Sequence, residues 1–206
     1  MDINAHGIVN GKDEAFYTAL AQSELKGYNA FGVEDKDQYY FRGMFQRVLR
    51  SLEYMKSLPE WDGKNIVVAG GSQGGAQSLV AAALDPDVTV CVAYVPAMID
   101  QFGQSNRRNG SWPYVLKMQD GQYVNPKIAD TVKYYDAGFF ARRIKNAKCY
   151  LSTGFIDTTC PPVTVYAAFN EIPASVKTIH NDIPFGHKTP PETYTEGANF
   201  AVGQLK

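Results

Sequence analysis

The chain has 206 residues, of which 45% are hydrophobic and 20% charged, and its formal net charge is -1. This balance is that of a globular domain and excludes wholesale disorder. The near-neutral charge argues against a general nucleic-acid or anionic-membrane binder, and no apolar run approaches the roughly 20 residues of a membrane span.

Helix and strand signals alternate along the chain, with no internal repeat and no linker. The clearest helix covers residues 38–57, whose apolar residues recur at spacings of three and four and form one stripe. Further helices are expected at 13–26, at 76–84, in two pieces of 127–145 divided near Gly138, from Pro161-Pro162 to Ile172, and from near Pro191 toward Leu205. Residues 100–126 carry Gly, Asn, Pro and scattered aromatics, which predicts an irregular, lid-like excursion.

Four short apolar runs are expected to form strands, at residues 65–69, 88–95, 149–153 and 176–180. Runs that are apolar on both faces are typical of buried parallel strands. Strands separated by helices predict βαβ units, and hence a parallel sheet with helices on both faces. The fold class is therefore three-layer α/β.

The turn after the first strand, Gly70-Gly71-Ser72-Gln73-Gly74, matches G-x-S-x-G. The pattern alone is weak, because a glycine turn containing a serine also occurs by accident. Here a buried strand precedes it and a helix follows, as in the strand–elbow–helix that lifts a nucleophilic serine clear of a sheet. So tight a turn is expected to require glycine at Gly70 and Gly74, and Ser72 is the candidate nucleophile.

A nucleophilic serine needs a base, and the chain has three histidines. His6 precedes the serine, and His180 lies inside a predicted strand, where a packed or surface role is favoured. His187 follows the fourth strand, in a loop at the carboxyl edge of the sheet, where open α/β sheets place their sites. His187 is therefore the candidate base, against the alternative of a surface loop histidine.

The base needs a carboxylate to orient it. Asp157 follows the third strand at the same edge, and the order Ser72, Asp157, His187 is that of α/β-hydrolases. Asp100, just after the second strand, is the second candidate. The structural alternative for Asp157 is a helix N-cap ahead of Pro161-Pro162.

These motifs resemble the acetyl xylan esterase and cephalosporin C deacetylase family of α/β-hydrolases. The likeness covers nearly the whole chain. It is carried by Gly70–Gly75, Asp157–Pro162 with Tyr166–Asn170, and Phe185–His187, and also by Tyr39–Gly43 and Leu58–Lys64. By this resemblance Ser72 is the nucleophile, His187 the base, Asp157 the acid, and the Gln73 backbone N–H one oxyanion donor.

Two departures from the family pattern stand out. Its Arg-Gly-Gln turn is replaced by His6-Gly7-Ile8, and its earlier strands, including the segment that supplies the second oxyanion donor, are absent from the sequence. Residues 1–206 are therefore expected to form a single, partial α/β-hydrolase catalytic domain that lacks the N-terminal strands. The first residues do not resemble a signal peptide, while the family resemblance is compatible with an extracellular or periplasmic location.

Trp112, in the excursion, is a candidate substrate-binding residue that could stack on a sugar ring; anchoring the excursion is an equal alternative. No nucleotide motif or metal-ligand spacing is present, and Cys91, Cys149 and Cys160 are too scattered for a zinc site or a disulfide framework, so no cofactor and no metal are expected. Cys160 is expected to serve packing and turn geometry rather than catalysis.

The predicted function is a serine ester hydrolase that removes acetyl or other small acyl groups from a carbohydrate such as acetylated xylan. The alternatives are a broad carboxylesterase or serine peptidase with the same triad, and a truncated, non-catalytic fragment. The strand at Asn65–Ala69 is apolar on both faces, so a bare edge there would recruit another chain. We expect either an upstream segment or a neighbouring subunit to cover it.

Overall fold

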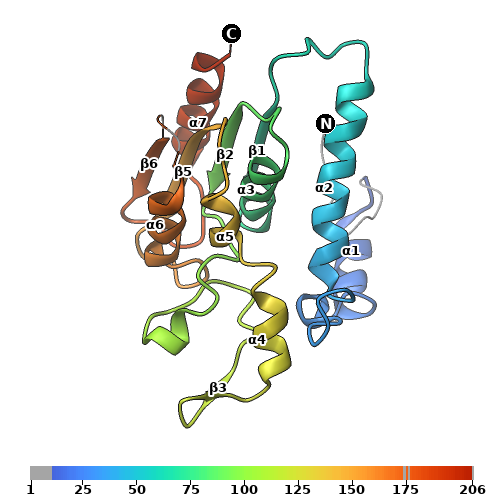
Figure 1. Cartoon of the computed structure of the whole chain (residues 1–206), viewed down its shortest axis with the longest axis vertical. Coiled ribbons are helices and arrows are strands. Elements are labelled where there is room, and N and C mark those ends of the chain that lie inside the picture. The colour runs from blue at the N-terminus through green and yellow to red at the C-terminus, as the bar shows by residue number, and fades with distance from the viewer. Residues whose placement is uncertain (1–10, 174, 176, 206) are drawn as a thin grey trace.

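The computed structural model describes residues 11–173, 175 and 177–205. Its centre is a four-stranded parallel sheet with the order β1-β2-β5-β6 (Figure 1). The strands are β1 (Val67–Gly71), β2 (Val90–Tyr94), β5 (Lys148–Gly154) and β6 (Lys177–Asp182). The prediction of an α/β fold built on a parallel sheet is confirmed, and each strand lies within two residues of its expected bounds.

Helices cover both faces of this sheet. On one face α3 (Gln73–Leu84) and α6 (Pro162–Glu171) contact the strands, and α5 (Ala137–Ala141) packs against both of these helices. On the other face α7 (Pro191–Gly203) packs on β2 and β5. Side chains along β2 point alternately to the two faces of the sheet and so take part in two hydrophobic cores. Cys91 and Ala93 belong to the larger core, whereas Val90 and Val92 belong to a smaller core with Ala201 of α7. Cys91 and Cys149 are fully buried and free, as expected.

Helix α2 (Tyr40–Ser57) follows α1 (Glu14–Gln22) and the short η1 (Tyr28–Ala30), and α2 packs on α3. The predicted apolar stripe of α2 is its buried face, formed by Phe41, Met44, Phe45, Val48 and Leu52. No helix in the described part of the chain is long and apolar enough to cross a bilayer.

The excursion after β2 contains η2 (Gly103–Asn106) and the small antiparallel pair β3 (Met118–Gln119) and β4 (Gln122–Tyr123), followed by α4 (Pro126–Val132). It projects from one end of the sheet (Figure 1). The two helical pieces expected here are α4 and α5, and the break between them, at residues 133–136, ends just before Gly138, which lies in the first turn of α5. Asp136 is the N-cap of α5, and its side chain accepts hydrogen bonds from the backbone N–H groups of Gly138, Asp100 and Gln101.

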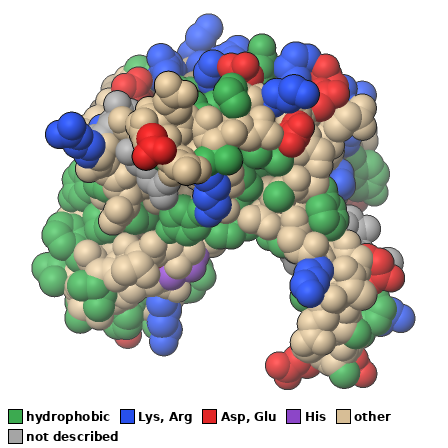
Figure 2. Space-filling view, turned by 90° about the horizontal axis from the view of Figure 1, so that it is seen from below, with side chains coloured by type: hydrophobic (Ala, Val, Ile, Leu, Met, Phe, Trp, Pro, Cys, Tyr) green, Lys and Arg blue, Asp and Glu red, His purple; other side chains and the backbone are tan. Residues whose placement is uncertain are grey.

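Strand β1 lies at one edge of the sheet. No strand among the described residues pairs with its outer side, and Val67 of this strand is 38% exposed. A groove of about 320 Å³ runs beside it, between β1, α3 and the Val48, Leu52 and Met55 side chains of α2. Seen from below, the molecule is deeply hollowed on one side (Figure 2). The expectation that another segment or subunit covers β1 stays a prediction.

Candidate active site

Ser72 occupies the elbow between β1 and α3. Its φ of 52° and ψ of -116° lie outside the ordinary regions for a residue with a Cβ atom, a conformation that costs roughly 1–3 kcal/mol. The surrounding backbone holds it there: Ser72 N–H donates to Tyr94 O at 2.8 Å, and Ser72 O accepts from Ala76 N at 3.1 Å and Ala97 N at 3.0 Å. A strained elbow of this kind points the serine oxygen away from the sheet.

Glycine is expected at both Gly70 and Gly74 of the elbow, but only at Gly70 do the described neighbours leave no room for a side chain. A Cβ atom on Gly70 would lie 2.5 Å from the carbonyl carbon of Gly74, so this strand end can pass the helix start only as glycine. The expectation is wrong for Gly74, beside which a Cβ atom would meet nothing within 4 Å. Gly74 instead lines the groove next to β1.

His187 stands between Ser72 and Asp157. Its Nε2 lies 2.8 Å from Ser72 Oγ, and its Nδ1 lies 2.8 Å from Asp157 Oδ2. The loop that carries it is drawn to the end of β5, where Ile156 N–H donates to Phe185 O at 3.1 Å. Gly154 permits this approach, because a Cβ atom there would clash with the carbonyl oxygen of Gly186.

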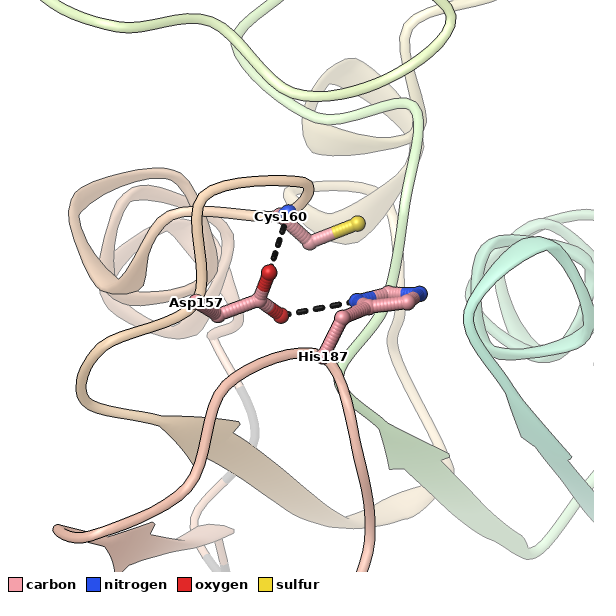
Figure 3. Close-up of side chains that lie close together, drawn as sticks. All are labelled: Asp157, Cys160 and His187. Carbon is pink, nitrogen blue, oxygen red and sulfur yellow. Dashed lines mark hydrogen bonds and ion pairs between the residues drawn. The ribbon is translucent and has the colours of Figure 1, made fainter.

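Asp157 is held by its own loop. Its side chain is fully buried, and Oδ1 accepts from the backbone N–H groups of Thr159 at 2.8 Å and Cys160 at 2.9 Å, which leaves Oδ2 for His187 (Figure 3). The carboxylate thus caps the turn ahead of α6 and orients the histidine, so the two interpretations of Asp157 are compatible. Asp100 faces elsewhere, in an ion pair with Arg108 at 2.8 Å.

The pKa of His187 is raised from its ordinary value to about 10, chiefly by the hydrogen bond to Asp157 and next by the Cys160 thiol, while burial opposes the shift. The same interactions would stabilise the imidazolium that forms when the ring takes a proton from Ser72. The geometry therefore suits a general base whose charged form is favoured by a fixed carboxylate.

Gln73 is the first residue of α3, and its backbone N–H lies in the first turn, where N–H groups have no partner within the helix. A helix N-terminus favours developing negative charge, as an oxyanion donor must. The Gln73 side chain is also fixed: Tyr28 OH donates to its Oε1 at 2.9 Å, and its Nε2 lies 3.1 Å from Met44 Sδ. No sequence pattern singles out Tyr28 for this contact.

Trp112 lies close to this assembly. Its ring packs edge-on against Phe41, with ring centres 5.7 Å apart, and lies 6.2 Å from the ring of Tyr28. The backbone N–H of Trp112 donates to Thr159 O at 2.9 Å, so the excursion is tied to the loop of Asp157. These contacts agree with an anchoring role, and stacking on a sugar stays a prediction.

His180 stands apart from the serine. His180, on β6, pairs through Nδ1 with Glu196 of α7 at 2.7 Å and through Nε2 with Asp182 at 3.3 Å, which is a packed structural position. His6, and with it the turn His6-Gly7-Ile8, lies outside the described residues.

A parallel sheet covered on both faces, a serine elbow after one strand, and the order Ser72, Asp157, His187 along the chain are the features of an α/β-hydrolase. Within that fold, the family model for acetyl xylan esterase (AXE1) matches residues 1–201. The chain therefore belongs to the acetyl xylan esterase family.

Three relatives define the extent of the match. The acetyl esterase Axe7A of Xylanibacter ruminicola is 41% identical over 198 residues, which are 95% of this chain and 44% of that protein. The solved acetyl xylan esterase from Paenibacillus sp. R4 has a TM-score of 0.76 at 28% identity, covering 87% of this chain and 58% of its own. Acetyl xylan esterase 1 from Thermoanaerobacterium sp. has the same TM-score at 25% identity, covering 98% and 62%. The chain thus spans about half the length of these relatives.

Proposed function

We propose that this chain carries the catalytic triad of a serine ester hydrolase that removes acetyl or other small acyl groups from carbohydrate hydroxyls. The main support is a pair of hydrogen-bond contacts. Ser72 Oγ lies 2.8 Å from His187 Nε2, and His187 Nδ1 lies 2.8 Å from the buried Asp157 carboxylate. This is the geometry that a nucleophile, a base and an orienting acid require.

The reaction follows from these positions. Ser72 Oγ attacks the ester carbonyl carbon as His187 Nε2 accepts its proton, and Asp157 stabilises the imidazolium and holds the tautomer. The carbonyl oxygen becomes an oxyanion against the Gln73 N–H. The imidazolium then protonates the departing sugar alcohol, leaving an acyl group on Ser72, and a water molecule deprotonated by His187 releases the acid.

The substrate class rests on the relatives. Axe7A is named as an acetyl esterase, and the two solved relatives as acetyl xylan esterases. We infer acetylated xylan or xylo-oligosaccharide as the substrate here, with no cofactor in the chemistry. Trp112 would supply an aromatic surface for a sugar ring close to the reacting ester. Its ring contacts Tyr28, and the Tyr28 hydroxyl in turn bonds to the side chain of Gln73, the oxyanion donor.

The test is a substrate panel on the purified chain: acetate release from acetylated xylo-oligosaccharide, hydrolysis of a p-nitrophenyl ester, and cleavage of a peptide. The proposal expects acetate release to exceed peptide cleavage. Dominant peptide cleavage would indicate a serine peptidase, a preference for the simple ester over the acetylated sugar would indicate a broad carboxylesterase, and no turnover would indicate a non-catalytic fragment.

A fluorophosphonate probe provides a second readout that needs no substrate. It reacts with an activated serine, so the label should map to Ser72 and to no other serine. Labelling elsewhere would overturn the assignment of the nucleophile, even if the chain hydrolyses esters.

A further inference from the structure

Cys160 belongs to the same cluster as the acid and the base. One donor atom each from Asp157, Cys160 and His187 lie within 4.8 Å of one another. Figure 3 shows the Cys160 sulfur pointing toward the side of the ring that carries the nitrogen bonded to Asp157. In the hydrolytic mechanism the thiol neither attacks the substrate nor transfers a proton, so its only effect there is on the pKa of His187.

We propose that Asp157, Cys160 and His187 form an inhibitory binding site for a thiophilic divalent cation, for which Zn²⁺ and Cd²⁺ are the probes. The inhibitory part of this inference rests on the proposed hydrolase function, whereas binding of the cation does not.

The donor set selects the class of cation. A thiolate, an imidazole nitrogen and a carboxylate oxygen are ligands of Zn²⁺ and similar borderline or soft ions, whereas Mg²⁺ and Ca²⁺ take oxygen ligands. Bond lengths of about 2.3 Å to sulfur and about 2.0 Å to nitrogen place the ligand atoms of a tetrahedral site roughly 3.5 Å apart. The three donor atoms lie within 4.8 Å of one another, and Nδ1 and Oδ2 are hydrogen-bonded at 2.8 Å. A cation that replaces the proton between these two atoms would move them apart by roughly 0.7 Å. A water molecule would complete the fourth position.

Charge and burial point the same way. The side chain of Asp157 is fully buried and Cys160 is buried too, while the His187 side chain is 28% exposed. Two buried anions together would be costly, but a doubly charged cation between a carboxylate and a thiolate makes the cluster neutral. The partly exposed His187 ring is the route by which the cation reaches the two buried donors.

Binding would reverse the direction of the hydrogen bond to the serine. The Cys160 thiol releases its proton to solvent, Asp157 stays a carboxylate, and His187 Nδ1 binds the cation through its lone pair. When His187 is neutral, the proton on Nδ1 moves to Nε2 and only the thiol proton leaves. When it is an imidazolium, which its raised pKa favours, Nε2 already carries a proton and the Nδ1 proton leaves as well. Nε2–H then donates to Ser72 Oγ and cannot accept its proton, so the base is lost although every residue remains in place.

The spacing explains why sequence patterns miss this site. Asp157 and Cys160 are three residues apart, but His187 lies 27 residues beyond Cys160 on the loop after β6. Only the contact between the ends of β5 and β6 brings the three together. A local cysteine and histidine motif is therefore absent.

The binding experiment uses Cd²⁺ and the thiolate-to-cadmium charge-transfer absorption in the ultraviolet. The chain and its Ser72→Ala variant should both show the band at one Cd²⁺ per chain. Cys160→Ser should lack it and bind at least about tenfold more weakly. Cys91→Ala, which removes a buried thiol of the sheet, should keep the band, and Mg²⁺ should neither produce nor displace it. Circular dichroism checks that each variant is folded.

The inhibition experiment adds Zn²⁺ or Cd²⁺ to ester hydrolysis and to fluorophosphonate labelling of Ser72, with reversal by EDTA. Each variant is compared with its own metal-free rate, and Cys160→Ser should need at least about tenfold more cation for the same loss. Equal binding or equal inhibition in the chain and Cys160→Ser, or no band with the unaltered chain, would overturn the site. The two proposals fail separately. If the unaltered chain shows the Cd²⁺ band but hydrolyses no ester, only the hydrolase proposal fails. If it hydrolyses esters but shows no band, only the metal site fails.

Discussion

The catalytic end of the sheet and its β1 edge contrast sharply. At the catalytic end, both oxygens of Asp157 and both ring nitrogens of His187 have partners among the described residues. At the β1 edge, an apolar strand faces a groove and no described strand. The contacts among Ser72, His187 and Asp157 can thus form at one end of a sheet while the side of the same sheet stays open, because loops at the strand ends supply them.

The opposite edge shows what a strand built for an edge looks like. Strand β6 is rich in polar residues that bond to the flanking helices: His180 to Glu196, Asn181 to Tyr166, and Asp182 to Thr193. Such residues protect an edge from pairing with another chain. β1 has valine, alanine and glycine, which is the composition of an interior strand.

The strongest test of the catalytic end is Ser72→Ala. It should lower ester hydrolysis by about 10⁴-fold or more and leave the fold intact, since triad members act as a unit. Activity assays with circular dichroism measure both. A variant that keeps most of its rate would show that Ser72 is not the nucleophile.

Asp157→Asn should lower kcat by about 10³- to 10⁴-fold, because an amide can favour the wrong histidine tautomer. Asp100→Asn is the matched control: Asp100 pairs with Arg108 and not with His187, so this variant should lose little. An equal loss in both variants, or a larger one in Asp100→Asn, would contradict the choice of acid.

The pH profile of kcat/KM should rise with pH, by about tenfold per unit on its acid limb, because His187 must be neutral to accept a proton. The pKa of His187 is raised, first by the hydrogen bond to Asp157, so the midpoint should lie above the ordinary imidazole value of about 6.5. The assay should contain EDTA to exclude cation binding. A midpoint at or below about 6.5 would contradict the predicted stabilisation of the imidazolium.

The β1 edge is tested by self-association. The isolated chain should associate with rising concentration in sedimentation velocity, and Val67→Lys, which places a charge on the exposed edge, should weaken this several-fold. Lys177 at the start of β6 offers a control, since Lys177→Val should not relieve association. A monodisperse monomer that is stable and unaltered by Val67→Lys would mean that β1 is a true edge and needs no covering segment or subunit.

The smallest effect is expected for Cys160→Ser in metal-free buffer. The bond from Cys160 to Asp157 comes from the backbone N–H, which serine retains. The variant should therefore keep a substantial fraction of the rate. A loss as large as that of Ser72→Ala would show that the thiol takes part in the chemistry.

Much of the molecule follows from local sequence. The stripe of α2, the apolar strands and the glycine elbow at Ser72 are each set by neighbouring residues, so their patterns predict them correctly. The parallel sheet follows from the alternation of these elements, and its carboxyl edge limits the candidate base and acid to a few residues.

Tertiary structure decided what depends on segments distant in sequence. Asp157 and Asp100 both follow strands at the same edge, and only the close passage of Gly154 by Gly186 brings His187 to Asp157. The same passage sets Cys160 beside the histidine, which no spacing indicates. The open side of β1 and the free space at Gly74 are likewise properties of packing, because strand pairing and steric room depend on which distant segments lie alongside.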